Sequence, residues 1–328
     1  MHHPSHSATL GIRVGRVAVP RRRPSTSRSA ATDYGGPVDY ARVVTRTLHW
    51  YAHAARDLPW RRPEAGPWAI MVSEFMLQQT PVARVLQPWQ EWMRRWPTPA
   101  ALADAPSGEA VRAWGRLGYP RRALRLHQAA TAIRDDHDGQ VPDDYQALLA
   151  LPGVGSYTAA AIASFAFGRR HVVLDTNVRR VQARIATGVE FPATAPTAAE
   201  RLLAERFLPA RPARAARWAV ASMELGALIC TARGPLCEQC PVRAECAWHR
   251  AGRPAHDGPP RVGQRYQGTD RQCRGALLAV LRSSDEAVPA EELEVAWPDP
   301  VQRERALASL ITDRLVVAVG PDRYALPD

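Results

Sequence analysis

Glu74 has a residue type and a sequence context that suit general acid catalysis. On a helix, its neighbours three and four positions away are mostly apolar: Ile70, Met71, Leu77 and Gln78. A carboxyl group on such a face loses water, which raises its pKa toward the value that a general acid needs near neutral pH. A glutamate at the rim of a pocket, paired with an arginine, fits the pattern equally well. The pattern alone leaves both interpretations open.

A second carboxyl group, that of Asp175, follows the apolar residues 172–174 and precedes a helix marked by Val178, Val181 and Ile185. Its default role is to cap that helix, and a helix N-terminus also favours the ionised carboxylate. A protonated carboxyl group beside a carboxylate is the pairing that cleaves glycosidic bonds. Glu74 and Asp175 are therefore candidates for the acid and the anionic stabiliser of such a reaction.

Four of the five cysteines lie between residues 230 and 246, in the spacing C-x6-C-x2-C-x5-C. Four clustered thiolates can hold either a zinc ion or an iron–sulfur cluster, and the spacing alone does not separate the two. Disulfides are the weaker explanation in a cytoplasmic chain, and four unrelated buried thiols would leave the clustering unexplained. The candidate ligands are Cys230, Cys237, Cys240 and Cys246.

A Gly-x-Gly turn at residues 153–155 comes directly before a helical pattern at residues 158–167. Backbone N–H groups exposed at such a helix start bind phosphate. No strand pattern precedes the turn and no third glycine follows in the register of a dinucleotide-binding fold, which excludes that fold. A tight turn between two packed helices would use the same glycines.

The chain of 328 residues has 43 basic and 32 acidic residues, a formal net charge of +11, and every basic residue is an arginine because there is no lysine. This surplus favours a polyanionic partner such as nucleic acid, with a coding bias toward arginine as the alternative. The hydrophobic content of 46% is typical of a globular protein, and no apolar run is long enough to cross a membrane. Without a signal-peptide pattern, we expect a cytoplasmic, nucleoid-associated protein.

Composition and the positions of proline and glycine divide the chain into four parts. Residues 1–36, with six arginines and no apolar periodicity, predict a disordered basic arm, although a misassigned start codon explains them equally well. Residues 37–250 read as successive helices separated by proline and glycine, which predicts an all-α domain. Residues 251–272 resemble a linker. Residues 273–328 carry three short helical patterns and a hairpin pattern, which predicts a small winged-helix-like domain.

Between residues 37 and 248 the chain resembles the A/G-mismatch-specific adenine DNA glycosylases (MutY-type) of the helix-hairpin-helix, endonuclease III-like superfamily. The resemblance rests on Leu58-Pro59-Trp60-Arg61, Ser73-Glu74, Met76-Leu77-Gln78-Gln79-Thr80, Leu117-Gly118-Tyr119, the segment 151–158, Leu174-Asp175, Asn177-Val178 and Glu224-Leu225-Gly226. It implies a six-helix barrel plus an iron–sulfur domain, in which the four cysteines hold a [4Fe–4S] cluster.

The resemblance also implies a monofunctional DNA glycosylase of base excision repair. Such an enzyme flips adenine mispaired with 8-oxoguanine or guanine out of double-stranded DNA and hydrolyses its glycosidic bond, leaving an abasic site. Glu74 would protonate adenine N7, Asp175 would stabilise the oxocarbenium-like sugar, and Tyr157 and Asn177 would help to hold the site. The resemblance implies three further sets of contacts. Arg56, Leu58, Trp60 and Arg61 would surround the adenine, and Gln79 and Tyr119 would act as wedges in the duplex, with Gln78 and Leu117 beside them. The amides of Gly153, Val154 and Gly155 would contact a backbone phosphate.

Position 157 discriminates between activities within this superfamily. Relatives that also nick DNA carry a lysine there, which forms a Schiff base with the sugar. Here the residue is Tyr157, and no lysine exists elsewhere in the chain. We therefore expect little or no strand-cleaving lyase activity.

Two departures from the family pattern concern the opposite base and the loop before Tyr119. Full-length members append a Nudix-like domain that senses 8-oxoguanine, but only 82 residues follow Cys246, with a different pattern. Arg116 replaces a glycine that is usual before Leu-Gly-Tyr.

The rival functions are a T/G-mismatch thymine glycosylase and a catalytically silent iron–sulfur DNA-binding regulator. By default, the resemblance implies a monomer.

Overall fold

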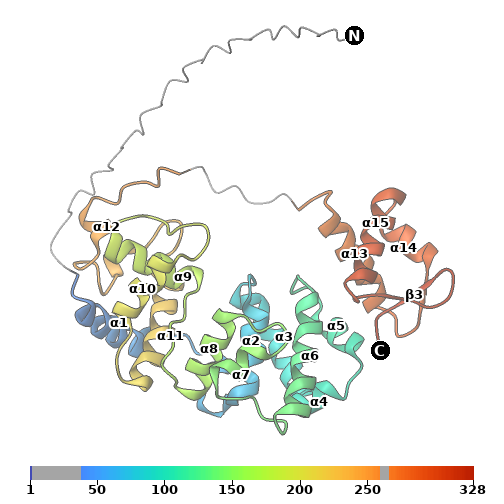
Figure 1. Cartoon of the computed structure of the whole chain (residues 1–328), viewed down its shortest axis with the longest axis horizontal. Helices are drawn as coiled ribbons and strands as arrows, with labels where there is room; N and C mark the ends of the chain where they lie inside the picture. The colour runs from blue at the N-terminus through green and yellow to red at the C-terminus, as the bar shows by residue number, and fades with distance from the viewer. Residues whose placement is uncertain (2–37, 259–265) are drawn as a thin grey trace. The chain divides into compact units, whose positions relative to one another are not determined.

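The computed structural model describes Met1, residues 38–258 and residues 266–328. Apart from Met1, the predicted basic arm lies outside the described residues. The described part up to residue 258 is helical, and its helices fall into two groups that are visible in Figure 1. This arrangement confirms the prediction of an all-α core.

The first group surrounds the cysteine loop. It consists of α1 (Tyr40–Ala54), α9 (Thr176–Gln182) with a π-helical turn (Ala183–Thr187), α10 (Ala198–Phe207), α11 (Pro212–Leu228) and α12 (Ala247–Arg250). Helix α11 is central, because it contacts both α1 and α9. Buried side chains from all of these helices form one apolar core. Examples are Val43, Val181, Phe207 and Trp218.

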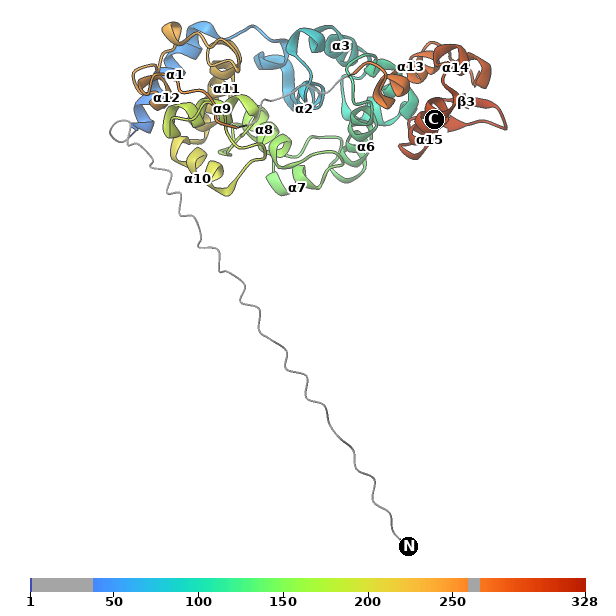
Figure 2. The same ribbon diagram turned by 90° about the horizontal axis from the view of Figure 1, so that it is seen from above.

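The second group carries the hairpin that the glycines predicted. It consists of α2 (Gly66–Leu77), α3 (Val82–Arg95), α4 (Pro99–Ala103), α5 (Ser107–Trp114), α6 (Arg121–Asp136), α7 (Tyr145–Ala150) and α8 (Ser156–Phe167). Helices α7 and α8 pack against each other across the turn 151–155, and α2 packs on α8. Because α8 also contacts α11, it joins the two groups; Figure 2 shows α8 between them from a second direction.

The C-terminal residues form three helices and a small antiparallel sheet. Its elements are α13 (Asp270–Arg282), β1 (Val288–Pro289), α14 (Ala290–Ala296), α15 (Pro300–Thr312), β2 (Val317–Ala318) and β3 (Arg323–Ala325). The strands pair antiparallel in the order β1-β3-β2. Strand β1 was not predicted, because two residues give no alternating pattern. Helix α13 begins inside the predicted linker, since Thr269 caps it by accepting a hydrogen bond from the Gln272 amide.

This C-terminal domain is bonded to α5. The Gly108 amide donates to the Pro327 carbonyl at 2.7 Å, and a Cβ at Gly108 would lie 2.2 Å from that oxygen. Arg112 donates to the Arg282 carbonyl at 2.6 Å, while the Arg282 Nε donates to the Val111 carbonyl at 2.9 Å. In each of these three hydrogen bonds the acceptor is a backbone carbonyl.

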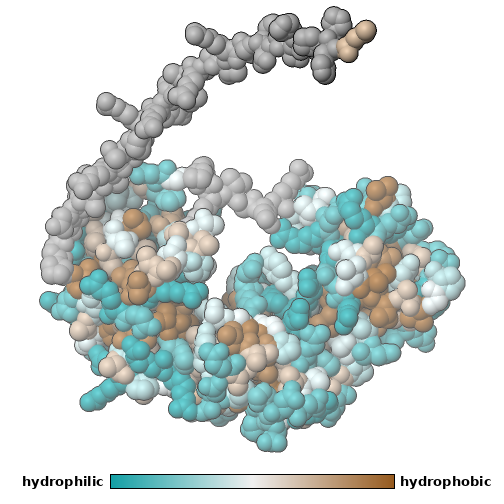
Figure 3. Space-filling view, viewed as in Figure 1, coloured by the Kyte–Doolittle hydropathy of each residue, from teal (hydrophilic) through white to brown (hydrophobic). Residues whose placement is uncertain are grey.

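The surface of the C-terminal domain differs in charge from the rest of the chain. Residues 266–328 contain seven arginines and eleven acidic residues, whereas residues 37–265 contain 30 arginines and 20 acidic residues. Figure 3 shows hydrophobic residues at the surface of this domain, and Val295 and Val301 are 85% and 68% exposed.

Among the described residues, no helix has the length and apolar character needed to cross a membrane.

Candidate active site

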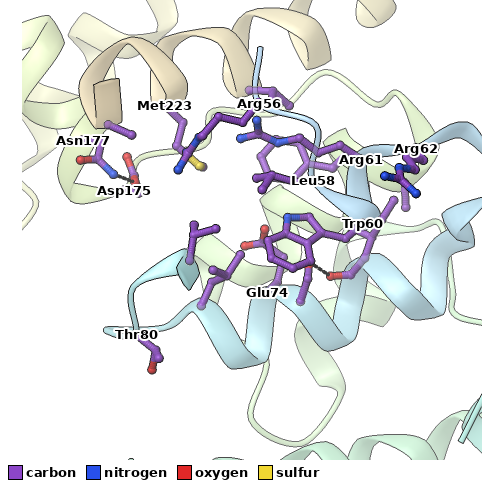
Figure 4. Close-up of a pocket in the computed structure, with 18 of the residues that line it drawn as sticks. Arg56, Leu58, Trp60, Arg61, Arg62, Glu74, Thr80, Asp175, Asn177 and Met223 are labelled. Atoms are coloured by element: carbon purple, nitrogen blue, oxygen red, sulfur yellow. Dashed lines mark hydrogen bonds between the residues drawn. The ribbon is translucent and has the colours of Figure 1, made fainter. Parts of the chain in front are cut away.

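A cavity of about 790 Å³ lies between the two groups of helices and is lined by residues from both. Glu74 on α2 and Tyr157 on α8 come from the second group, whereas Asp175 and Asn177 stand at the start of α9 in the first. Figure 4 shows Asp175 and Asn177 at one end of the cavity and Leu58, Trp60 and Arg61 at the other. The fold therefore brings together residues that are about a hundred positions apart in sequence.

Glu74 is buried, with 6% of its surface exposed, on a helix whose other residues are mostly apolar. Burial raises the pKa of its carboxyl group to about 7, and the nearby charge of Asp175 acts in the same direction. The Tyr157 hydroxyl donates a hydrogen bond to this carboxyl group and partly offsets the effect, as does the positive charge of Arg61. A carboxyl group with a pKa near 7 can hold and release a proton at neutral pH.

Asp175 caps α9 through one oxygen and holds Asn177 through the other. Its Oδ1 accepts from the Val178 amide at 2.6 Å, and its Oδ2 accepts from the Asn177 Nδ2 at 2.8 Å. We expected the helix N-terminus to favour the anion, and these hydrogen bonds do lower the pKa of Asp175. Burial acts more strongly, so the pKa of Asp175 is raised above its ordinary value. The cap therefore opposes the cost of burying the charge without cancelling it.

Asn177 is fixed from the opposite side by the side chain of Arg180. The Arg180 Nη2 donates to the Asn177 Oδ1 at 2.9 Å, and its Nε donates to the Cys230 carbonyl at 2.8 Å. A Cβ at Gly226 of α11 would lie 2.7 Å from the Asn177 Cβ, so only glycine permits this packing. A continuous set of hydrogen bonds therefore links Asp175 to the cysteine loop.

The far end of the cavity is organised by Glu224, a fully buried residue of α11 that stands in the sequence only as part of the motif Glu224-Leu225-Gly226. Arg56 donates to both of its carboxylate oxygens, at 2.8 and 2.7 Å, and the Arg61 Nη2 donates at 2.9 Å. These arginines hold the pKa of Glu224 at about 2 despite its burial. The signal in the sequence was an acidic residue within the apolar run of α11. Glu224, and not Glu74, is thus the arginine-paired glutamate of the cavity.

Of the residues predicted around an adenine, Arg56, Leu58, Trp60 and Arg61 all line the cavity. Leu58 and Trp60 are buried, and the Trp60 ring packs edge-on against Trp89 at 5.5 Å between centroids. Trp60 stands in a short 3-10 turn, Pro59–Arg61, where proline fixes the backbone, and Leu58 directly precedes this turn. The wall can contact the face of a planar base.

The predicted wedge residues lie outside the cavity lining, in two loops. Gln79 follows α2 and Tyr119 precedes α6, and both have positive φ angles, 56° and 48°. Gln78 donates to the Thr158 Oγ1 at 3.4 Å, which ties its loop to α8, and Leu117 is buried below the second loop. This backbone conformation could not be predicted from the residue types, because residues other than glycine rarely adopt it.

The hairpin turn is closed by a backbone hydrogen bond of Val154. Its amide donates to the Leu151 carbonyl at 3.1 Å, and the contact of this turn with a phosphate stays a prediction. Gly153, with φ at 78°, packs against Arg125 and Phe75, and its Cβ would lie 2.6 Å from the Arg125 Cβ. Gly155 is exposed at the start of α8, where no side chain caps the helix. The amides at this helix start are the ones positioned for an anion.

The four cysteines of the loop line a common apolar cavity together with Val181, Ile185, Leu225 and Trp248. The buried Arg184 donates to the Cys230 Sγ at 3.3 Å and stacks over the Trp248 ring. Burial raises the pKa of Cys240 to about 12 and that of Cys246 to about 11. In the parts of the chain that the structure describes, no three histidine, cysteine or acidic side chains are arranged to hold a single metal ion.

Comparison with known proteins places this chain among DNA repair enzymes. Residues 72–207 match the family of HhH-GPD superfamily base excision DNA repair proteins. The chain is 54% identical over 284 residues to the adenine DNA glycosylase of Mycobacterium tuberculosis (strain CDC 1551 / Oshkosh), which covers 86% of this chain and 93% of that protein. It is 35% identical over 208 residues to the thymine-DNA glycosylase of Aeropyrum pernix, covering 62% and 92%.

Among solved structures, a thermostable thymine-DNA glycosylase is similar, with a TM-score of 0.57 and 27% identity over 65% of this chain and 97% of that one. The prediction of a helix-hairpin-helix glycosylase fold is confirmed. The adenine-specific relative is matched at higher identity and over more of this chain than the thymine-specific one. The chain therefore belongs to the MutY-type adenine DNA glycosylases of the helix-hairpin-helix superfamily.

Proposed function

We propose that this protein releases adenine from mispaired positions in double-stranded DNA by hydrolysing its glycosidic bond. The observation that carries the proposal is the buried Glu74, with a pKa of about 7, in one cavity with Asp175. The relatives named adenine DNA glycosylases support the choice of base. The apolar wall of Leu58 and Trp60 offers a surface for one face of a flipped purine, and the Arg56–Glu224 ion pair offers polar groups for its edge.

The proposed reaction begins with the proton on Glu74, which moves to N7 of adenine. The bond between the base and C1′ of the sugar then breaks, and its electron pair leaves with the now neutral base. Asp175 stabilises the positive charge that develops on the sugar, and Asn177 holds its carboxylate in place. Water adds a hydroxyl group to C1′ and returns a proton to Glu74, which leaves an abasic site.

The proposed partner is double-stranded DNA, with adenine opposite 8-oxoguanine or guanine. The 30 arginines of residues 37–265, against 20 acidic residues, favour a polyanion, and the start of α8 offers backbone amides to a phosphate. We propose a monomer, as the resemblance to the family implies.

We propose that the four cysteines hold a [4Fe–4S] cluster. The four cysteines line one apolar cavity, and their spacing resembles that of the [4Fe–4S] loop of the family to which the chain belongs. Thiols with pKa values of about 11 and 12 need a strongly positive centre to ionise. When bound, the cluster would supply a rigid cross-link between α11 and the loop, below Arg180.

Purified protein is expected to contain four iron and four sulfide ions per chain, with the broad visible absorption of such a cluster. Cys237→Ser should lower the iron content and the melting temperature, because it removes one of the four ligands. Cys273→Ser, a change to the buried cysteine of α13, is the matched control and should keep the iron. One equivalent of zinc in place of iron would refute the cluster.

A single-turnover assay tests the function and the expected absence of lyase activity. The duplexes carry adenine opposite 8-oxoguanine, adenine opposite guanine, or thymine opposite guanine. Adenine release is expected from the first two, and strand breakage only after hot alkali, because Tyr157 cannot form a Schiff base and the chain has no lysine. The ratio of the first two rates gives the preference for the opposite base.

Strand breakage without alkali would contradict the monofunctional mechanism. Release of thymine alone would favour the activity named for the Aeropyrum pernix relative. Tight binding without release from any duplex would indicate a silent DNA-binding regulator and overturn the proposed function.

A further inference from the structure

Two exposed residues near the cavity hold a backbone conformation that is unfavourable for them. Gln79, in the loop after α2, has a φ of 56°, and Tyr119, in the loop before α6, has a φ of 48°. Residues with a Cβ avoid this left-handed region, so the surrounding structure has to stabilise it. Neither loop contains an element of secondary structure that would do so.

The loop of Gln79 is held by Arg122 of α6. The Arg122 Nη1 donates to the carbonyls of Phe75 at 2.8 Å, Met76 at 3.1 Å and Gln78 at 2.6 Å. These carbonyls belong to the end of α2, where a helix leaves its last acceptors without partners of its own. A side chain from another helix thus caps α2 at the point where the loop turns.

The same guanidinium holds the loop of Tyr119 through its other nitrogen. The Arg122 Nη2 donates to the Gly118 carbonyl at 2.9 Å, the Thr80 Oγ1 at 3.1 Å and the Leu117 carbonyl at 3.4 Å. Thr80 in turn donates to the Leu117 carbonyl at 3.1 Å. One planar, five-donor group therefore bonds to both loops, which a lysine could not do with its single ammonium.

Two aromatic rings complete the surroundings of Arg122. Its guanidinium lies 5.2 Å from the Trp114 ring centroid and 5.6 Å from that of Tyr119. Burial lowers the pKa of Arg122 to about 10, so the group is still charged at neutral pH and its hydrogen bonds are charge-assisted. Arg122 does not line the cavity that holds Glu74 and Asp175.

We propose that Arg122 is a positioning residue that fixes Gln79 and Tyr119 relative to each other, so that both can enter the duplex together and displace the mispaired base. This inference rests on the proposed function, because it assigns the two residues a place in the flipped-base complex. It predicts that Arg122 contributes to extrusion of the base and not to breakage of the glycosidic bond.

The variant Arg122→Gln tests this division. Misplacement of the two loops should lower the single-turnover rate of adenine release by about 10²-fold. The pH dependence of the remaining activity should be unchanged, because Glu74 is untouched. Arg134→Gln, which removes a surface arginine from the same helix, is the matched control and should keep the rate.

A second measurement detects extrusion of the base in a protein that cannot break the glycosidic bond. In the Glu74→Gln background, 2-aminopurine placed beside the mispaired adenine reports unstacking by a rise in fluorescence when the protein binds. Adding Arg122→Gln should remove most of this rise at saturating protein, while Arg134→Gln should leave it. A lost rate with a preserved rise, or an unchanged rate, would overturn the inference.

If Arg122→Gln does not fold, as judged by its thermal melt, Arg122→Lys serves in both measurements. It keeps the charge but cannot bond to both loops, so the rate and the fluorescence rise should fall together. A wild-type protein that releases no adenine would instead be a failure of the proposed function, which the same assay detects first.

Discussion

The variant Glu74→Gln is expected to lower the rate of adenine release by a factor of about 10²–10⁴, the usual contribution of a positioned general acid. Glutamine keeps the size of the side chain and can accept the hydrogen bond from Tyr157, but it has no proton to give to the base. Single-turnover kinetics on a duplex with an A:G mismatch measure the effect. Duplex binding and the melting temperature should stay close to those of the wild type.

The pH dependence of the wild-type rate gives an independent check of the role of Glu74. The acid is active when protonated, and burial raises its pKa to about 7. The rate should therefore be high below that pH and fall about tenfold per unit above it.

Glu64→Gln is the matched control for Glu74→Gln, since Glu64 is an exposed glutamate in the short turn before α2. It should change neither the rate nor its pH dependence. A Glu74→Gln protein with an unchanged rate would rule out Glu74 as the acid.

The variant Asp175→Asn should cost about 10³-fold in rate, because it removes the negative charge that faces the developing cation. Asparagine is as good an N-cap as aspartate, so α9 and the overall stability should be preserved. Thermal melts and single-turnover rates measured on the same preparation separate the two effects.

Asp144→Asn provides the matched control for Asp175→Asn. Asp144 caps α7 by accepting from the amides of Gln146 and Ala147, both at 2.9 Å, and lies outside the cavity lining. Its substitution should leave the rate within about twofold.

The raised pKa of Asp175 also predicts how the wild-type rate depends on pH. The rate should fall on the acid side at a higher pH than an ordinary aspartate would give, and Asp175→Asn should lack that fall.

The helical core and the carboxyl pair could be predicted from the sequence because each rests on local information. Helical spacing placed Glu74 on an apolar face, and the residues before and after Asp175 marked a helix start. The structure brings both residues to one cavity, as the resemblance to the family implied. Their catalytic roles remain predictions for the kinetic tests above.

The partners of the arginines could not be predicted, because they depend on contacts between distant segments. Glu224 is bound by Arg56 and Arg61, more than 160 residues away in sequence. Arg122 donates to carbonyls of two loops. Every residue has a backbone carbonyl, so the residue types do not reveal which carbonyls act as acceptors. The hydrogen bond within the turn at Val154 could not be predicted for the same reason, since its acceptor is the Leu151 carbonyl.

The acidic C-terminal domain affects how a duplex meets the enzyme. With seven arginines and eleven acidic residues, it repels phosphates, whereas the excess of arginine in residues 37–265 attracts them. A molecule with charge separated in this way has an electric dipole, and a polyanion that diffuses toward it experiences a torque as well as an attraction. The torque turns the arginine-rich part of the enzyme toward the DNA before the two touch. Fewer encounters are then lost to orientations in which α13–α15 would meet the duplex first.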